Sequence, residues 1–366
     1  RAPLTPVRRP PASSWELIRT FIPGTASPQA SASLPFSTSP AGRAVRRPRH
    51  RHGGVMSILN GPFTFRQAAT KGVHPKELGE LCAAGELVRP SQGLFLPRHL
   101  ADDPDARIAA ISLVLPPGAA VARETAAWLL GVDVRPPARW QHAPLLECLV
   151  PLGAIRPRRP DVRAYISDLP AQDVMTLGPV PCTTATRTAL DLARYRPRFL
   201  GLGAVDALTH LGLTSVPELK AAATGLDGHR FIRRAREVID LCEPATESTG
   251  ESWTRLRIID AGFPRPTVQI SLRDSTGREV YRLDMGFKDA KVAVEYDGTE
   301  HHLRTVAQRA HDDARRDDIH ARFGWHTLAA DKGGVLGARP DLEGALMEAL
   351  GLSFEYRRQA WHSFDV

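Results

Sequence analysis

Cysteine is scarce in this sequence of 366 residues, and its cysteines lie far apart. They are Cys82, Cys148, Cys182 and Cys242. Zinc sites and redox motifs place cysteines within a few residues of one another, which no pair here does. We therefore expect four reduced and mostly buried thiols in a cytoplasmic protein, with neither a disulfide framework nor a zinc site.

Long hydrophobic runs are also missing. The most apolar stretch, residues 108–122 (IAAISLVLPPGAAVA), is interrupted by Pro116 and Pro117. A membrane-spanning helix needs about 20 consecutive apolar residues, and this stretch is shorter. The sequence therefore predicts a soluble protein with no membrane partner.

Acidic residues are almost absent from residues 1–55, which contain nine arginines, no lysine and a single acid, Glu16. The whole chain has 48 basic and 40 acidic residues and a net charge of +8. Subtracting the nine arginines and one acid of this segment leaves 39 basic and 39 acidic residues in the rest of the chain. The net charge thus lies in this segment and gives no evidence that the rest of the chain binds a polyanion.

Proline, serine, alanine and arginine dominate the same segment, and large apolar residues are few. Such a composition cannot bury enough apolar surface to offset the entropy of ordering the chain. The first methionine is Met56. We expect residues 1–55 to be disordered or to precede the true start of translation; a transit peptide and a nucleic-acid-binding arm are the alternatives.

Two short helices and a hairpin are predicted between residues 61 and 97. Thr64 is a suitable N-cap for the first helix, and the second is expected to begin at His74–Pro75 and to end near Gly85. The text ELVRPSQGLFLP then alternates around a Ser-Gln-Gly turn, which is typical of a hairpin. This order is the winged-helix pattern, in which the second helix can enter a DNA major groove.

Basic side chains of this unit are candidates for DNA contact. They are Arg66, Lys71, Lys76 and Arg89. Glu77, Glu80 and Glu86 oppose them, and two of these acids belong to the second predicted helix. DNA binding and docking to a protein partner therefore both remain open.

Helix and strand patterns continue through residues 100–200. VARETAAWLLGV predicts an amphipathic helix, LLECLVP a buried strand, and PCTTATRTALDLAR a helix capped by Thr183 or Thr184. Together with FTFRQAATKGVHPKELGELCAAGELVRPSQGLFLP before them, these segments resemble AbiEi-type antitoxins of type IV toxin–antitoxin systems. The resemblance implies a winged helix that binds promoter DNA, an α/β domain that supports it, and a toxin as a possible partner.

Residues 201–245 are predicted to be helical. They end in RFIRRAREVIDLCEP, an amphipathic helix whose arginines are Arg230, Arg233, Arg234 and Arg236. This cluster is either a solvated helix face or a face that contacts DNA phosphates. In the second case Arg233 and Arg234 are the candidate DNA contacts.

The last part of the chain begins with a predicted helix and three strands. Ser248 or Thr249 caps the helix, and Glu247 and Glu251 lie on similar sides near its start. The strands follow Gly262 and are separated by Asp-Ser-Thr-Gly and Lys-Asp-Ala turns. A charged helix and a final strand, WHTLAA, are expected after them.

The second and third of these strands bring carboxylates together. If Phe287 pairs with Val292, Asp284 lies opposite Glu295, and the two side chains are close. Asp297 shares the face of Glu295, because side chains alternate along a strand. Opposed like charges are destabilising unless a cation neutralises them, and Mg²⁺ or Mn²⁺ takes oxygen ligands of this kind. Asp284 and Glu295 are therefore the candidate metal ligands.

This segment and the charged helix after it (TEHHLRTVAQRAHDDARRDDIHARFGW) resemble the Vsr-like endonucleases of the PD-(D/E)XK superfamily. The residues that carry the resemblance are Glu251, Asp284, Glu295, Asp297, His301, His302, Arg316 and Asp317. It implies metal-dependent hydrolysis of a nucleic-acid phosphodiester, in which Asp284 and Glu295 ligate Mg²⁺. By the same resemblance, His301 or His302 acts as a base or stabilises the leaving group.

Two further roles and one departure from the family pattern belong to this resemblance. Glu251 helps to hold the metal or its water, and Arg316 and Asp317 form an orienting ion pair. Asp297 stands where the superfamily usually has a lysine, two residues after Glu295, so the role of that lysine has no assigned residue.

The sequence as a whole predicts a multidomain α/β protein, with a winged helix, a small α/β domain and a restriction-endonuclease-like α/β domain. The expected divisions are a disordered tail (1–55), the winged helix (56–99), an antitoxin-like α/β and helical domain (100–243), the nuclease-like domain (244–335) and a C-terminal tail (336–366). Two functions follow. One is a Mg²⁺-dependent DNA endonuclease with an N-terminal DNA- or partner-binding module. The other is an antitoxin-like DNA-binding transcriptional regulator with an inactive nuclease fold.

Overall fold

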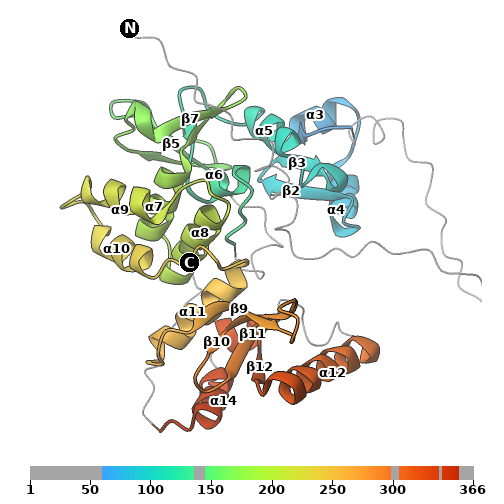
Figure 1. The fold of residues 1–366 in the computed structure, drawn as a ribbon. Helices are drawn as coiled ribbons and strands as arrows, with labels where there is room; N and C mark the ends of the chain where they lie inside the picture. Colours follow the sequence, from blue (N-terminus) through green and yellow to red (C-terminus); the bar gives the residue numbers. More distant parts are fainter. Residues whose placement is uncertain (1–59, 136–144, 298–304, 338–339, 354–366) are drawn as a thin grey trace, which may run out of the picture.

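The computed structural model describes residues 60–135, 145–297, 305–337 and 340–353 (Figure 1). The expectations for residues 1–55 lie outside this range. The described strands form a three-stranded, a five-stranded and a four-stranded sheet, each accompanied by helices. The predicted mixed α/β architecture is therefore confirmed. No helix in the described parts is long and apolar enough to cross a membrane.

Two short helices and a hairpin form the first unit. Its elements are β1 (Phe63–Thr64), α3 (Phe65–Thr70), α4 (Pro75–Ala83), β2 (Leu87–Ser91) and β3 (Leu94–Pro97), with the strand order β1-β3-β2. Thr64 caps α3 and His74 caps α4, each in a reciprocal capping box. Both helices and the hairpin lie where the sequence predicts them.

A five-stranded sheet follows. Its elements and neighbours are η1 (Arg98–Leu100), α5 (Pro104–Ser112), β4 (Ala120–Val121), α6 (Arg123–Leu129), β5 (Leu146–Val150), β6 (Val162–Ile166), η3 (Ala171–Asp173), β7 (Val174–Leu177) and β8 (Val180–Thr183). The strand order is β6-β5-β4-β8-β7. Every residue of β5 is buried, which agrees with the apolar run that predicts it.

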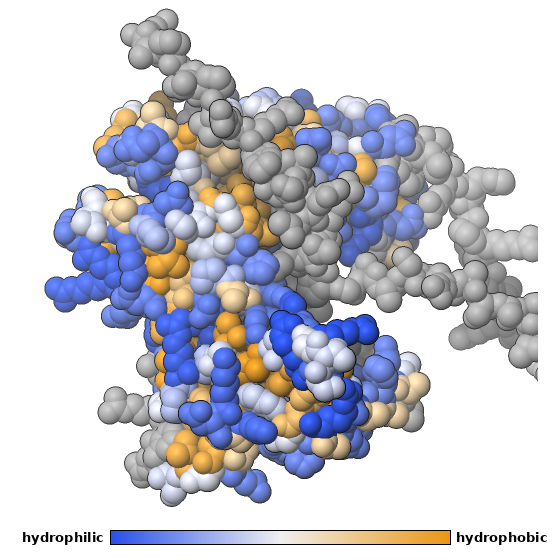
Figure 2. Space-filling view, in the orientation of Figure 1, coloured by the Kyte–Doolittle hydropathy of each residue, from blue (hydrophilic) through white to orange (hydrophobic). Residues whose placement is uncertain are grey.

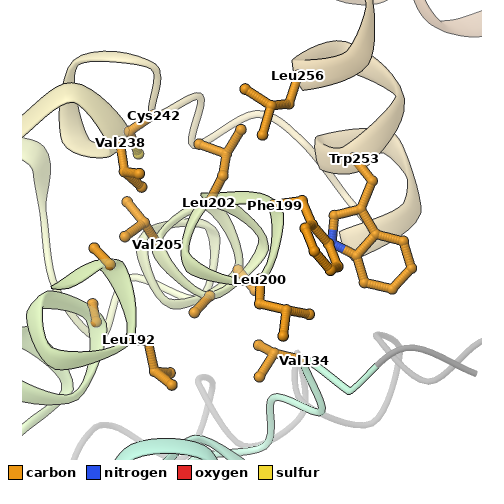
Figure 3. Close-up of a cluster of buried hydrophobic side chains, with 14 of the residues drawn as sticks. Val134, Leu192, Phe199, Leu200, Leu202, Val205, Val238, Cys242, Trp253 and Leu256 are labelled. Carbon is orange, nitrogen blue, oxygen red and sulfur yellow. The ribbon is translucent and has the colours of Figure 1, made fainter. Parts of the chain in front are cut away.

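Four helices come next in the sequence. They are α7 (Ala185–Tyr195), α8 (Arg198–His210), α9 (Val216–Thr224) and α10 (Ile232–Asp240). Thr184 caps α7, as one of the two predicted alternatives. Gly201 lets α8 approach α7 closely, because a Cβ atom there would lie 2.9 Å from the Cα of Ala193. Figure 3 shows Leu202 and Val205 of α8 in the buried cluster of these helices.

The C-terminal unit contains the four-stranded sheet. Its elements are α11 (Thr249–Asp260), β9 (Thr267–Arg273), β10 (Glu279–Phe287), β11 (Val292–Asp297), α12 (Val306–Phe323), β12 (His326–Asp331), α13 (Lys332–Leu336) and α14 (Asp341–Leu350). The strand order is β12-β11-β10-β9, with β11 and β12 parallel and the other pairs antiparallel. Helix α12 lies between β11 and β12 in sequence and packs Ile319 in one cluster with Ala293.

Helix α11 joins this sheet to the helices before it. Trp253 of α11 lies edge-on to Phe199 of α8, with ring centroids 5.9 Å apart (Figure 3). Arg255 of α11 pairs with Asp206 of α8 at 2.6 Å. Val294 of β11 belongs to the same buried cluster as Trp253. One hydrophobic core therefore extends from α7–α10 into the C-terminal sheet.

Residues 341–350 correct one expectation. They were predicted to belong to a C-terminal tail, but they form α14 and pack into the core. Leu342 and Leu346 are four residues apart, lie on one side of the helix and are buried. Glu343 accepts a hydrogen bond of 2.7 Å from Arg257 of α11. Apolar spacing and this ion pair fix the segment against α11.

Candidate functional site

Asp284 lies where β10 and β11 separate. The two strands pair through Phe287 with Val292 and through Met285 with Val294, which is the predicted register. At Asp284, Oδ2 accepts a hydrogen bond of 2.7 Å from the backbone N–H of Tyr296. The last pair between β10 and β11 is Met285 with Val294, so the N–H of Tyr296 lies beyond it. The side chain of Asp284 gives this backbone donor its hydrogen-bond partner.

Three carboxylates influence one another at this point. Burial raises the pKa of Asp284 to about 7, and the negative charges of Glu251 and Glu295 raise it as well. Glu251, on α11, also has a raised pKa, mainly because it is buried. We call Glu251, Asp284 and Glu295 the carboxylate cluster.

Arg315 of α12 neutralises one member of the cluster. Its guanidinium donates to both carboxylate oxygens of Glu295, at 2.6 and 2.8 Å. Bidentate pairs of this kind are the strong ones among charged hydrogen bonds. Arg315 was not among the predicted site residues, although helix periodicity carries a signal for it. It precedes Ile319 by four residues, and Ile319 is buried against the sheet.

Glu251 is held by two donors. Its Oε2 accepts from the backbone N–H of Glu247 at 3.2 Å and from Nε2 of Gln269 at 3.0 Å. Gln269, on β9, was also missed. Its φ of 48° lies in the left-handed region, which is unusual for a glutamine in a strand.

These contacts leave few carboxylate oxygens for a cation. Both oxygens of Glu295 bind Arg315, and one oxygen each of Asp284 and Glu251 binds N–H donors. Among the described residues, no group of three or more His, Cys, Asp or Glu side chains is arranged to hold a metal ion. The residues as placed therefore do not form a ready Mg²⁺ or Mn²⁺ site, and Arg315 supplies the positive charge.

Other candidates for this site lie at its edge or beyond the described residues. Asp297 ends β11 opposite Asp331 of β12. Burial, followed by the charges of these two aspartates, raises the pKa of Tyr296 to about 12. His301 and His302 are outside the residues that the structure describes, so their role stays a prediction.

Arg315, rather than Arg316, contacts the carboxylates. Arg316 pairs with Asp313 on the same helix at 2.9 Å, and Asp317 is exposed. Successive residues of a helix point about 100° apart, so two neighbouring arginines cannot both face the sheet. The surface over α12 is mainly hydrophilic in Figure 2, as its charged residues require.

The first unit presents its predicted DNA contacts to solvent. The exposed residues are Arg66 on α3, Lys71 at its C-cap, Lys76 on α4 and Arg89 on β2. One opposing acid is used locally, since Glu77 accepts a hydrogen bond of 2.9 Å from the backbone N–H of His74. This contact caps the helix and leaves the charge of Glu77 in place, so acids and bases still oppose one another around α4.

The arginines of α10 differ in their surroundings. Arg233 is exposed, whereas Arg234 is half-buried and donates to the carbonyl oxygen of Arg194. Burial lowers the pKa of Arg234. Arg236 forms an ion pair with Asp227. The predicted DNA contacts Arg233 and Arg234 thus do not share one environment.

Two family models match the part of the chain before α11. Residues 57–98 match the model described as a transcriptional regulator, AbiEi antitoxin, and residues 119–241 match the AbiEi antitoxin C-terminal domain. Both segments are thus similar to AbiEi antitoxin domains. The first AbiEi match contains α3, α4 and the hairpin, and the second runs from β4 through α10. The carboxylate cluster lies outside both matches, in the C-terminal unit.

Similar proteins come from Mycobacterium tuberculosis. The uncharacterized proteins MT2308 and Rv2248, from its strains CDC 1551 and H37Rv, are each 29% identical over 220 residues, which are 60% of this chain and 76% of theirs. The crystal structure of the RV2827C protein is 17% identical, covers 54% of this chain and 78% of that chain, and has a TM-score of 0.28. That similarity is too low to support an argument about the fold.

Proposed function

We propose that this protein is a DNA-binding transcriptional regulator of the AbiEi antitoxin type. In this proposal α3, α4 and the β2–β3 hairpin form a winged helix, whose second helix enters the major groove while the hairpin contacts the backbone. The observation that carries it is the match of residues 57–98 to the AbiEi transcriptional-regulator model. A toxin is the partner that both AbiEi matches favour.

Helix α4 is suited to approach DNA closely. Lys76, Gly79 and Ala83 are exposed on it, and a Cβ atom added at Gly79 would meet nothing within 4 Å. Lys76 lies in the first turn, where the backbone N–H groups of the helix add positive potential toward a phosphate. Arg66 and Arg89 can contact phosphates on either side of such a groove.

Binding to duplex DNA from the region upstream of the protein's own coding sequence tests this function. Lys76→Gln is expected to weaken binding several-fold in fluorescence anisotropy and to reduce the slope of log affinity against log salt by about 1. Lys220→Gln is the matched control, because it removes an exposed lysine of α9 that pairs with Asp240. Equal affinity of Lys76→Gln and wild type would exclude α4 from the interface.

A second candidate function is metal-dependent hydrolysis of DNA phosphodiesters, for which the carboxylate cluster supplies negative charge but, as placed, no ready site for the ion. Its own burial and the negative charges of Glu251 and Glu295 raise the pKa of Asp284 to about 7, and a divalent cation stabilises such concentrated negative charge. The function requires Glu295 to exchange Arg315 for the ion. His301 and His302 stay candidates for proton transfer.

Plasmid DNA incubated with Mg²⁺ or Mn²⁺ separates the two functions. A nuclease cleaves it, and Asp284→Ala abolishes the cleavage. If both proteins are inert with either ion while DNA binding persists, the C-terminal unit is an inactive scaffold and only the regulator function stands.

A further inference from the structure

Aromatic rings and guanidinium groups alternate in a continuous row between the starts of α6 and α10. The guanidinium of Arg123 lies 3.5 Å from the ring centroid of Tyr165 and 4.4 Å from that of Tyr195. Tyr195 meets Phe231 edge-on, with centroids 6.0 Å apart. The guanidiniums of Arg230 and Arg234 lie 4.5 and 5.0 Å from the ring of Phe231. We call Arg123, Tyr165, Tyr195, Arg230, Phe231 and Arg234 the arginine–aromatic row.

Helix α7 assembles the row. It ends at Tyr195 and packs against both α6 and α10 (Figure 1). Arg194, next to Tyr195, donates to the carbonyl oxygen of Arg230 at 3.1 and 3.2 Å, and Arg234 donates back to the carbonyl oxygen of Arg194. The row is therefore a fixed feature of the fold, although its residues are widely separated in sequence.

Backbone strain is concentrated in the row. Arg123 begins α6 with a φ of 51°, and Phe231 is the N-cap of α10 with a φ of 61°. Residues other than glycine seldom adopt this left-handed conformation, and bulky ones pay free energy for it. Both strained residues contact the same ring, Tyr195. Strain of this kind clusters at binding sites, where the side chain has to be held in place.

The guanidiniums of the row have hydrogen-bonding capacity that the described residues leave unused. Arg123 is only 7% exposed, and its Nε is buried without a hydrogen-bond partner, as is Nε of Arg234. Neither these two nor Arg230 forms an ion pair within the described parts of the chain. Other buried arginines here do, for example Arg187 with Asp191 and Arg255 with Asp206. Buried donors of this kind usually have partners, so the row lacks one.

We propose that the arginine–aromatic row binds an acidic segment of a partner protein. Carboxylates of the segment pair with Arg230, which is exposed, and Arg234, which is half-buried, and an apolar side chain covers Phe231, which is 42% exposed. The rings hold the guanidiniums by stacking, so the N–H groups are oriented before binding. Arginine and aromatic side chains are also the residues that dominate binding energy at protein interfaces.

Nucleic acid fits the row less well. Guanidiniums already lie over the rings of Tyr195 and Phe231, which leaves little ring surface for bases to stack on. Glu237 and Asp240 are exposed on α10, so a phosphate backbone laid along this helix would meet acids of its own sign. A short acidic segment avoids them. This surface is separate from the DNA contact proposed for α4.

Binding of labelled peptides to the full chain tests the proposal. The probes are a peptide of alternating glutamate and leucine, the same peptide with glutamine for glutamate, and oligothymidylate. We expect the acidic peptide alone to bind measurably. Arg230→Gln and Arg234→Gln should each weaken binding of the acidic peptide at least about thirtyfold, the loss of one desolvated charge pair. Arg236→Gln is the matched control, because Arg236 is on the same helix as Arg234 but its guanidinium is committed to Asp227, in the turn before that helix. The affinity of this variant for the peptide should equal that of wild type.

Phe231→Gly separates binding from folding. Glycine adopts the backbone conformation of this position without strain, so the variant should keep or raise the thermal midpoint and still lose affinity. Its binding to upstream DNA through α4 should be unaffected. An equal loss in Arg236→Gln would assign the effect to general charge and overturn the proposal. Tighter binding of oligothymidylate, weakened by the same substitutions, or no binding of the acidic peptide would overturn it as well.

Discussion

Asp206 of α8 and Arg255 of α11 form an ion pair of 2.6 Å in which their side chains are 1% and 0% exposed. Arg255 also donates to the carbonyl oxygen of Leu241 at 2.6 Å, and Asp206 accepts from the backbone N–H of Glu243 at 2.8 Å. The pair thereby fixes α8, α11 and the segment between α10 and α11 at one point. It holds the C-terminal unit on the helices that precede it.

Arg255→Met is expected to lower the free energy of unfolding by about 3–5 kcal/mol, because it leaves Asp206 buried without its partner. The double variant Asp206→Leu with Arg255→Met removes both charges and should recover much of this loss. Urea unfolding at a fixed pH measures both values. A loss below about 1 kcal/mol in the single variant would be typical of a solvated surface pair and would contradict the buried arrangement.

Asp284 should make stability depend on pH. Its pKa is about 7 in the folded protein, against an ordinary value of 3.8. Between these values the folded state keeps a proton that the unfolded chain has lost. The stabilising contribution is therefore complete below pH 3.8 and is lost as the pH rises through 7.

Asp284→Asn removes this titration while keeping an acceptor for the N–H of Tyr296. We expect the variant to be more stable than wild type at pH 8, by at most about 4 kcal/mol, because one pKa unit corresponds to about 1.4 kcal/mol. The difference should shrink toward pH 5. Urea unfolding across this range measures it, and a constant difference at every pH would show that Asp284 titrates normally.

Local signals predicted much of the fold and part of the site. The caps at Thr64, Thr184 and Ser248 were among the residues named from sequence, because capping depends on a few neighbouring residues. The pairing of Phe287 with Val292 followed from the short turn between them. This register is what brings Asp284 level with Glu295.

Contacts between distant segments were not predictable in the same way. Arg315 and Arg316 are equivalent as residue types, and the rotation of α12 on the sheet decides which one reaches Glu295; the spacing of Arg315 from the buried Ile319 is the sequence signal for that rotation. Gln269 reaches Glu251 from a left-handed backbone that residue type does not signal. The packing of α14 depends on the pairing of Glu343 with Arg257, 86 residues apart in sequence.

Arg315→Gln removes the positive charge beside the carboxylate cluster. Arg315 lowers the pKa of Asp284, so its loss should raise that pKa further above about 7. Carbon-13 NMR of the carboxyl groups follows the titration. Arg316→Gln is the matched control, since Arg316 pairs with Asp313 and should leave the pKa of Asp284 unchanged. An equal shift in both variants would mean that the total charge of α12, rather than this contact, sets the value.

Gly250 brings the start of α11 against the ring of Tyr296. A Cβ atom at this position would lie 2.0 Å from Cε1 of the ring, so the ring or the helix has to move. The backbone N–H of Tyr296 donates a hydrogen bond to Asp284, and this bond limits how far Tyr296 can move away from the helix. We expect Gly250→Ala to lower the free energy of unfolding by about 1–3 kcal/mol, as overpacking does.

Gly344→Ala in α14 is the matched control for this substitution. It also replaces a helical glycine, but its Cβ atom would meet nothing within 4 Å. Alanine should therefore stabilise the protein there by roughly 0.5–1 kcal/mol, through its higher helix propensity. Denaturant unfolding of the two variants side by side isolates the contact with Tyr296 from the effect of propensity. Stabilisation by both would show that the ring moves aside freely and does not hold α11 on β11.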